Sequence, residues 1–314
     1  MTGDQWLARR TFDGAAVDPE SLARAKRDLG LTVSVCLPTL NVGDTVGAIV
    51  DSVRATWRDG DVRLVDEIVA VDSASADDTA ARVASAGGRV VQEKDVLPAM
   101  GPGAGKGEAM WKSLAASTGD VVVWLDSDVV DFDPMFVPGL LHPLLTVPEV
   151  GYVKAVYRRK LGDGDEGGRV TEICARPLVN LFYPELAVLA QPLSGEAAGR
   201  RSLLERLPFM SGYAVEMGLL IDILGLEGLD AIAQVDLDER RHTNQPTAAL
   251  GRMAYAIMRA VLARADGREL DASRAYLRPE RDGDAGWRLH VSEVNVTERP
   301  PMVEVAGYPA GRAR

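Results

Sequence analysis

Short apolar runs alternate with segments of helical spacing along the first half of the chain. Four runs rich in Val, Ile and Leu have the length of buried strands, and they span 31–37, 65–71, 88–92 and 120–125. Helices are predicted at 19–29, 47–56 and 108–116, and from Asp77-Asp78-Thr79 onward. This order predicts an α/β fold with a mostly parallel central sheet flanked by helices and joined by right-handed crossovers.

The second half of the chain is less regular, and only its strongest patterns support a prediction. Strands are expected at 152–157 and 231–235. Helices are expected at 171–189, with a break at Pro184, and at 214–223 and 248–265. Residues 266–314 are rich in Arg, Gly and Asp, so we expect an irregular tail there.

Composition narrows the class of protein. The net charge of −11 disfavours a nucleic-acid partner, because an acidic surface repels a phosphate backbone. No apolar run is long enough to span a bilayer and the N-terminus lacks a secretory signal, so we expect a soluble, cytoplasmic protein. Its two cysteines, Cys36 and Cys174, are expected to be buried thiols in a reducing compartment.

Asp126-Ser127-Asp128 carries the strongest chemical signal, because it directly follows a predicted buried strand. Ligands of parallel sheets gather beyond the carboxyl ends of the strands. Two carboxylates spaced i and i+2 at such an end can hold a divalent cation, which would stabilise a departing diphosphate. The alternative is an exposed acidic turn.

Weaker signals lie elsewhere. Lys106 stands in a glycine-rich loop and can reach a phosphate or a base, although the loop lacks the spacing of a P-loop. His242 has the chemistry of a third metal ligand, with a structural histidine as the alternative. Gly168-Arg169-Val170-Thr171 opens a predicted helix and forms either an anion site or an ordinary cap. Glu216 interrupts an apolar run, so it must be paired or functional.

Together these segments resemble the nucleotide-sugar half of a GT-A glycosyltransferase. That resemblance rests on Pro38-Thr-Leu-Asn41, Asp72-Ser-Ala-Ser75, Gly105-Lys-Gly-Glu108 and Asp126-Ser-Asp128. Further segments are similar to the retaining glucosyl-3-phosphoglycerate and mannosyl-3-phosphoglycerate synthases of actinobacteria, in glycosyltransferase family 81. These segments are Gly168-Arg-Val-Thr171, Gln191-Pro-Leu-Ser-Gly-Glu196, Gly212-Tyr-Ala-Val-Glu216, His242-Thr-Asn244 and Glu298-Arg-Pro-Pro-Met302.

The resemblance implies a role for each matching residue. The donor nucleotide would contact Pro38, Leu40, Asn41, Ser73, Lys106, Asp126 and Ser127. A divalent metal, Mg²⁺ or Mn²⁺, would be bound by Asp128 and His242. The acceptor would contact Gly168, Arg169, Thr171 and Asn244. The transferred sugar would lie at Glu216, Tyr213 and the backbone carbonyl of Leu193.

The implied activity is transfer of a hexose to the 2-hydroxyl of 3-phosphoglycerate. The product would serve the synthesis of a compatible solute or of a polysaccharide. UDP-glucose is the first expected donor and GDP-mannose the second. Relatives commonly show Asn-Glu-Glu where this chain has Asn41-Val42-Gly43-Asp44, which places the carboxylate differently beside the base and leaves the donor open. Retention favours attack of the acceptor on the face that the diphosphate leaves, with the leaving phosphate taking the proton. The resemblance also implies a homodimer without nucleic-acid or membrane partners.

The implied organisation has four parts. They are an N-terminal helical extension (1–30), a nucleotide-sugar-binding half (31–130), an acceptor-binding half (131–265) and the C-terminal tail (266–314). Alternatives are another metal-dependent GT-A enzyme with a different acceptor, an inverting enzyme acting on a polyprenyl phosphate, and a non-catalytic nucleotide-sugar sensor. A nucleotidyltransferase is disfavoured, because Pro38-Thr-Leu-Asn41 stands where it would need a glycine-rich loop.

Overall fold

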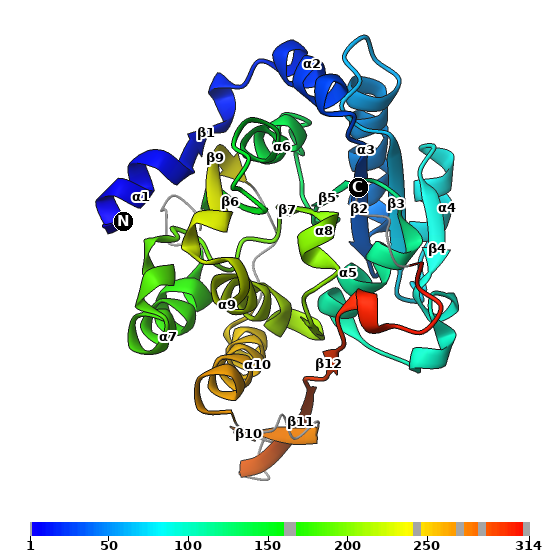
Figure 1. Cartoon of the computed structure of the whole chain (residues 1–314). Helices are drawn as coiled ribbons and strands as arrows, with labels where there is room; N and C mark the ends of the chain where they lie inside the picture. Colours follow the sequence, from blue (N-terminus) through cyan, green and yellow to red (C-terminus); the bar gives the residue numbers. More distant parts are fainter. Residues whose placement is uncertain (1, 160–167, 241–245, 268–272, 282–286, 310–314) are drawn as a thin grey trace.

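A twisted eight-stranded sheet forms the centre of the molecule (Figure 1). The computed structural model describes residues 2–159, 168–240, 246–267, 273–281 and 287–309. In spatial order the strands are β1 (Thr11–Asp13), β9 (Ile232–Arg240), β6 (Tyr152–Arg159), β7 (Ala197–Arg200), β5 (Val121–Trp124), β2 (Val33–Thr39), β3 (Glu67–Asp72) and β4 (Arg89–Gln92). Only β7 in this sheet runs antiparallel to its neighbours, so the predicted mostly parallel sheet is confirmed.

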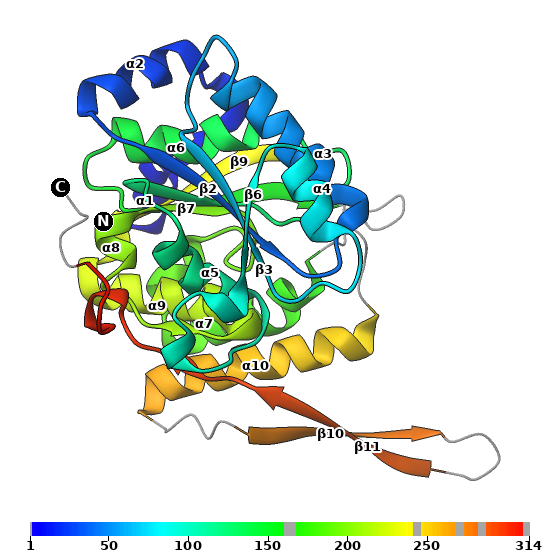
Figure 2. The same cartoon turned by 90° about the vertical axis from the view of Figure 1, so that its right-hand side faces the viewer.

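Helices cover both faces of the sheet (Figure 2). One face carries α2 (Pro19–Leu29), α3 (Gly43–Val53), α4 (Thr79–Ser85) and α6 (Phe136–Thr146). The other face carries α1 (Gly3–Arg10), α5 (Gly105–Ala116), α7 (Arg176–Phe182), α8 (Arg201–Leu204), α9 (Val215–Glu227) and α10 (Thr247–Asp266). None of the helices in the described ranges combines the length and apolar character that crossing a bilayer requires.

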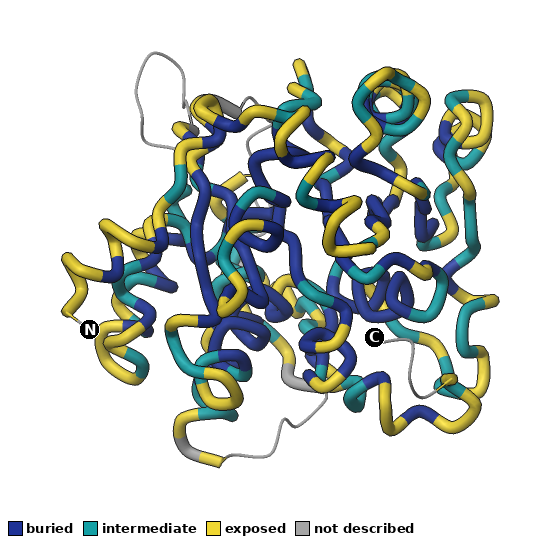
Figure 3. The backbone as a smooth tube through the Cα atoms, turned by 45° about the horizontal axis from the view of Figure 1, so that its top comes forward, coloured by how far each residue is buried: buried dark blue, intermediate teal, exposed yellow. Residues whose placement is uncertain are grey.

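The alternation of side chains along each strand divides the core into two layers. On β5, Val121 and Val123 pack with α3 and α6, whereas Val122 and Trp124 pack with α5 and α9. The sheet is therefore buried on both sides, which is why its strands are continuously apolar rather than alternating. Figure 3 shows the same pattern, with a buried interior and outer helices that are exposed along one side.

Local sequence explains the best-predicted helix. Asp18 accepts hydrogen bonds from the backbone amides of Glu20 and Ser21, and Pro19 occupies the first turn of α2. The helix ends at Gly30, whose φ of 65° lies in the left-handed region that glycine adopts at low cost. The predicted span of 19–29 is confirmed without change.

Three parts of the chain differ from the expectation. The N-terminal extension is not only helical, because β1 pairs in parallel with β9 at the edge of the main sheet. Helix α6 and the four-residue strand β7 had no distinctive pattern. The 171–189 segment is divided into a π-helical turn (Thr171–Ala175), α7 and a 3-10 segment (Pro184–Val188), with the expected break at Pro184.

The tail is not irregular. Strands β10 (Ser273–Arg281) and β11 (Trp287–Asn295) form an antiparallel ribbon that lies outside α10 (Figure 2). Strand β12 (Glu298–Arg299) then pairs with β8 (Phe209–Met210) on the body of the protein. Sequence analysis missed these strands because the ribbon is largely exposed and β10 contains Pro279, which argues against a strand.

Candidate active site

A pocket of about 540 Å³ opens beyond the carboxyl ends of β2, β3 and β5. Within the described chain, every residue that sequence analysis assigned to the site lines this pocket: Pro38, Leu40, Asn41, Ser73, Lys106, Asp126, Ser127, Asp128, Gly168, Arg169, Thr171, Leu193, Tyr213 and Glu216. His242 and Asn244 lie outside the described residues. The fold thus brings together segments that are more than a hundred residues apart in sequence.

The strand ends on one side of the pocket are tied to one another. The Ser127 hydroxyl donates to the carbonyl of Pro38 at 2.8 Å, and the Thr45 hydroxyl donates to the carbonyl of Ser127 at 2.5 Å. These two bonds join the end of β5 to the end of β2 and to the start of α3. The Asp-Ser-Asp segment is therefore held in one position relative to the loop that follows β2.

The loops after β2 and β3 are also fastened together. The side-chain oxygen of Asn41, whose φ is 53°, accepts from the backbone amide of Ala76 at 2.8 Å. The backbone amide of Asn41 donates to the hydroxyl of Ser75 at 2.9 Å. Ser75 in turn donates to buried Asp72. Positive φ is unusual for a residue other than glycine, and asparagine tolerates it best. Asn41 is therefore a turn-forming residue as well as a pocket residue.

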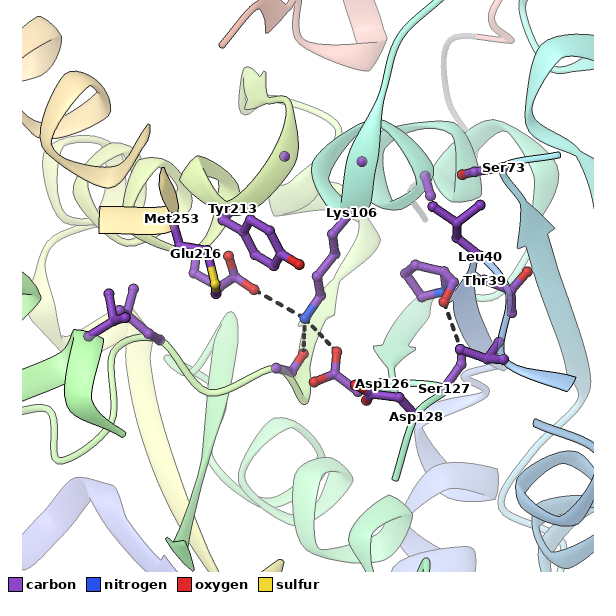
Figure 4. Close-up of a pocket in the computed structure, with 18 of the residues that line it drawn as sticks. Thr39, Leu40, Ser73, Lys106, Asp126, Ser127, Asp128, Tyr213, Glu216 and Met253 are labelled. Atoms are coloured by element: carbon purple, nitrogen blue, oxygen red, sulfur yellow. Dashed lines mark hydrogen bonds and ion pairs between the residues drawn. The ribbon is translucent and has the colours of Figure 1, made fainter. Parts of the chain in front are cut away.

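Lys106 is the electrostatic centre of the pocket (Figure 4). Its Nζ lies 2.6 Å from Asp126 Oδ1, 3.1 Å from Glu216 Oε1 and 3.0 Å from the carbonyl oxygen of Gly195. Burial alone would lower the pKa of Lys106, but the carboxylates of Asp126 and Glu216 outweigh that effect and raise it. Lys106 is thus a fixed positive charge between two buried segments.

The close approach of these segments depends on glycine. A Cβ at Gly195 would lie 1.7 Å from Asp126 Oδ2, which leaves no space for any side chain. Gly105, at the start of α5, has a φ of 78° and faces Gly212, whose φ is 64°. These glycines let Lys106, Asp126 and Glu216 meet at one point.

Asp128 differs from Asp126 in its surroundings. Asp126 is half-buried against Lys106, whereas Asp128 lies two residues further on and is exposed in the pocket lining. A carboxylate open to the pocket suits a hard cation that takes its remaining ligands from a diphosphate and water. In the described ranges no group of three or more His, Cys, Asp or Glu side chains could hold a metal by itself. Asp128 therefore fits a metal site that is shared with a ligand.

Glu216 and Tyr213 come from the turn into α9. Glu216 is buried and paired with Lys106, which resolves why a carboxylate interrupts an apolar run. Tyr213 is 48% exposed, and its ring lies beside Lys106 and Glu216 in the pocket (Figure 4). Burial and then the charge of Glu216 raise the pKa of the Tyr213 hydroxyl, so it stays protonated and can donate a hydrogen bond.

A different wall of the pocket carries Gly168, Arg169 and Thr171. Gly168 has a φ of 85°, and Arg169 donates to the hydroxyl of Thr247 at 3.4 Å. Thr171 is buried and begins the π-helical turn. The expected helix start is therefore confirmed, but its first turn is wider than that of an α-helix. Sequence analysis missed Leu250 and Met253 of α10, which also line the pocket.

A second lysine lies beneath the pocket and was also missed. Lys154 of β6 is buried, and its Nζ donates to the carbonyl of Ser194, next to the carbonyl that Lys106 holds. Burial lowers the pKa of Lys154 to about 8, although Glu216 acts in the opposite direction. The 191–196 loop is thus held from two sides. Its signal was hidden because Lys154 stands in an otherwise apolar strand.

The sheet order, the acidic strand end and the pocket beyond it define the GT-A fold of nucleotide-sugar glycosyltransferases. Residues 34–209 match the family model described as Glycosyl transferase family 2. The glucosyl-3-phosphoglycerate synthase of Mycolicibacterium paratuberculosis is 45% identical to this chain, over 96% of the chain and 92% of the relative.

Two enzymes of known structure are also similar. The mannosyl-3-phosphoglycerate synthase of Rubrobacter xylanophilus has a TM-score of 0.88 at 44% identity, covering 96% and 99% of the two chains. The glucosyl-3-phosphoglycerate synthase of Mycobacterium tuberculosis, in complex with Mn²⁺, UDP-glucose and phosphoglyceric acid, has a TM-score of 0.80 at 42% identity, covering 91% and 95%. A structure of that enzyme with Mg²⁺ and UDP has a TM-score of 0.82 at 41% identity, covering 93% and 98%.

The chain belongs to the family of glucosyl-3-phosphoglycerate and mannosyl-3-phosphoglycerate synthases. This confirms both the predicted GT-A fold and the predicted family. The narrower label of glycosyltransferase family 81 stays a prediction.

Proposed function

We propose that this protein transfers a hexose from a nucleotide sugar to the 2-hydroxyl of 3-phosphoglycerate with retention of configuration. The observation that carries this proposal is that one pocket contains the acidic strand end at Asp126, the buried Lys106 and, on a separate wall, Arg169. A donor and an anionic acceptor need two such regions side by side. The family membership supports the same reaction.

The donor is assigned to the strand-end side of the pocket. The nucleotide would lie on the loops of Pro38, Leu40, Asn41 and Ser73, next to Ser127. The diphosphate would lie near Asp128 and the N-terminus of α5, where no side chain of the described residues caps the helix. Backbone amides at a helix start attract anions. Lys106 beside that helix start adds a full positive charge.

A divalent cation, Mg²⁺ or Mn²⁺, completes the donor site. Asp128 would hold it together with His242, which lies outside the described residues. When bound, the cation neutralises charge on the diphosphate and so makes it a better leaving group. Asp126 is assigned to the donor rather than to the metal. Its carboxylate accepts a hydrogen bond from Lys106, and in that position it would contact the donor nucleotide.

The acceptor is assigned to the wall that carries Gly168, Arg169 and Thr171, with Asn244 as a further contact. Arg169 offers a planar fork that suits the carboxylate or the phosphate of 3-phosphoglycerate. Like the start of α5, the start of the 169–175 helical segment offers backbone amides to an anion. Leu250 and Met253 of α10 would close this side of the pocket against water.

Sugar transfer itself needs few protein groups. Glu216 and Tyr213 would hold the hexose, and the backbone carbonyl of Leu193 would face the positive charge that develops at its anomeric carbon. The acceptor hydroxyl attacks on the face that the diphosphate leaves, and a phosphate oxygen of the leaving group takes its proton. Lys106 keeps the 191–196 loop in place through the carbonyl of Gly195.

UDP-glucose is the first proposed donor, because the relatives include enzymes named for glucosyl transfer and one was solved with UDP-glucose. GDP-mannose is the second, because the Rubrobacter xylanophilus enzyme is named for mannosyl transfer. Val42 lines the pocket next to Asn41, and Gly43 and Asp44 follow it as the first residues of α3. We assign donor selection to this segment.

We also propose a cytoplasmic homodimer without nucleic-acid or membrane partners. Both cysteines are buried free thiols, which suits a reducing compartment. The β10–β11 ribbon exposes Leu277, Leu289 and Val291 to more than half of their full extent, and these apolar side chains suit a subunit contact. The proposed division into a donor half (31–130) and an acceptor half (131–265) is supported by the two groups of pocket residues, which come from 38–128 and from 168–253.

A matrix of turnover assays tests this function. UDP-glucose, GDP-glucose and GDP-mannose are each incubated with 3-phosphoglycerate and Mg²⁺, and products are identified by mass and proton NMR. We expect an α-linked hexosyl-3-phosphoglycerate that is lost on adding EDTA and in Asp128→Ala, but not in Asp95→Ala, which changes an exposed acid outside the pocket lining. Binding of the donors without product would contradict the acceptor assignment and leave a GT-A enzyme with another acceptor.

A further inference from the structure

Arg299 of β12 lies almost 200 residues after the 100–104 loop in the sequence, but its side chain holds that loop, which leads into the donor pocket. Its guanidinium donates to the backbone carbonyls of Met100 at 2.6 Å, Gly101 at 3.3 Å and Pro102 at 3.1 Å. The same group pairs with both carboxylate oxygens of Glu108, at 2.7 and 3.0 Å. Three consecutive carbonyls and one buried carboxylate thus converge on a single side chain.

The loop held in this way directly precedes Lys106. Residues 100–104 run into α5, where Gly105 and Lys106 line the pocket. Gly103 packs so closely on Glu108 that a Cβ there would lie 2.0 Å from Glu108 Cδ. The loop, the first turn of α5 and Arg299 therefore form one packed unit. A shift of the loop would be transmitted to the position of the Lys106 backbone.

The segment around Arg299 also holds a second segment of the pocket, which is adjacent to Gly105. The carbonyl of Thr297 accepts from the amide of Ser211 at 2.8 Å, and the amide of Thr297 donates to the Ser211 hydroxyl at 2.9 Å. Ser211 precedes Gly212 and Tyr213 of the pocket. The Arg299 guanidinium further lies 5.5 Å from the ring centroid of Trp111, whose indole donates to the carbonyl of Pro300. Residues 297–300 thus connect the loop before α5 with the segment before α9.

We propose that Arg299 is a positioning residue for donor binding, which sets the glycine-rich loop and the N-terminus of α5 so that Lys106 meets the diphosphate. This inference rests on the proposed function, because it assigns the donor to that side of the pocket. It goes beyond the family resemblance by giving the C-terminal segment a task in the donor site. The ribbon and β12 are contiguous in sequence, so a contact made by the ribbon would also bear on this site.

The test compares two arginine-to-lysine changes at opposite ends of α5. Arg299→Lys keeps a positive charge but loses the planar fork that reaches several acceptors at once. Arg201→Lys is the matched control, because the Arg201 guanidinium also bonds backbone, donating to the carbonyls of Leu114 and Gly119 near the other end of the helix. Both changes cost hydrogen bonds in a buried setting, but only Arg299 lies on the donor side.

We expect Arg299→Lys to raise the KM for the nucleotide sugar on the order of tenfold, because small displacements of a positioning group cost that much or more. The KM for 3-phosphoglycerate should stay within about twofold of wild type. Hydrogen exchange of residues 98–107 should become faster in Arg299→Lys, because the amides of Met100 and Gly101 belong to the held loop. Arg201→Lys should change neither the donor KM nor exchange in this loop.

An unchanged donor KM, or equal changes in the donor and acceptor KM values, would overturn the inference. Arg299→Ala removes every one of these contacts and is the harsher variant. If it does not fold, Arg299→Lys decides the question, because lysine retains the aliphatic part of the side chain and the positive charge. Wild-type protein that turns over none of the nucleotide sugars would contradict the proposed function instead. The exchange measurement, made without substrate, would then still decide whether Arg299 holds the loop.

Discussion

The ammonium nitrogen of Lys106 lies 2.6 Å from a carboxylate oxygen of Asp126. Lys106 belongs to the first turn of α5, and Asp126 follows the end of β5. Their side chains are 15% and 21% exposed, so the contact is shielded from water. Glu216 approaches the same ammonium at 3.1 Å. One lysine thus pairs with two carboxylates, one at the end of β5 and one on α9.

Removing this lysine should affect both stability and turnover. In Lys106→Met the two carboxylates stay buried without their cation, and we expect a loss of about 3 kcal/mol in the free energy of unfolding. Turnover should fall on the order of a hundredfold, because the charge that faces the diphosphate is lost. Urea unfolding and steady-state kinetics measure the two effects. Lys94→Met, at an exposed position, is the control, and equal stability of the two variants would argue against the pairing.

The close approach of Gly195 to Asp126 gives a sharper steric prediction. The methyl group of Gly195→Ala would lie 1.7 Å from Asp126 Oδ2, so either the loop or the carboxylate must move. We expect kcat/KM to fall by about tenfold or more. Gly225→Ala in α9 is the matched control: its methyl group meets nothing within 4 Å, and helix propensity should stabilise the protein by about 0.5–1 kcal/mol. Full activity of Gly195→Ala would contradict the packing.

The buried Lys154 predicts a pH dependence of stability. Its pKa is lowered to about 8, first by burial, while Glu216, Asp126 and Glu196 favour its charge and Lys106 opposes it. Between that value and the ordinary lysine pKa of 10.5, the unfolded chain binds a proton that the folded chain lacks. The contribution of Lys154 to stability therefore rises with pH across this window.

Lys154→Met isolates this contribution. From pH 8 to 9.5 the wild type should gain about 1.5 kcal/mol of unfolding free energy relative to Lys154→Met, because the slope starts at about half of 1.36 kcal/mol per pH unit and approaches that value as the folded lysine loses its proton. Urea denaturation of both proteins at the two pH values measures the difference. If the difference in unfolding free energy between the two proteins is the same at both pH values, the lysine stays charged in the folded state. If the wild type loses stability relative to Lys154→Met as the pH rises, the pKa of Lys154 is raised rather than lowered.

The exposed ribbon predicts where a homodimer would form. Leu277 and Val291 are directly opposite each other on β10 and β11, and they are 54% and 57% exposed. The other face of the ribbon is occupied, because Tyr276 packs against Tyr255 of α10. Replacing both apolar residues by Thr keeps strand-forming side chains but removes apolar area.

We expect the double variant Leu277→Thr/Val291→Thr to be a monomer by light scattering at a concentration where the wild type is a dimer. Leu181→Thr is the control, because Leu181 of α7 is 74% exposed and lies on a separate surface. A dimer that dissociates in Leu181→Thr and persists in the ribbon variant would place the interface on α7. A wild-type monomer would contradict the proposed dimer itself.

Sequence reading worked best where local physics dominates. The strands at 31–37 and 120–125 are apolar on both faces, and they became β2 and β5 with shifts of one or two residues at their ends. Helix α2 was specified by its cap and its glycine end. The polar strand ends marked the site, because Asp126-Ser127-Asp128 stands where a buried strand reaches solvent. These features depend on neighbours within a few residues, so a single sequence reveals them.

The α/β class, the acidic strand end and the residues that resemble the family's site could all be inferred from the sequence. Their contacts emerge only from the folded chain: Lys106 joins Asp126 to Glu216, Lys154 holds the 191–196 loop, and Arg299 returns from the tail to hold the loop before α5. Each is a contact between side chains and backbone far apart in sequence. No periodicity or cap encodes such a contact, because its free energy arises only once the packed core has brought both partners out of water.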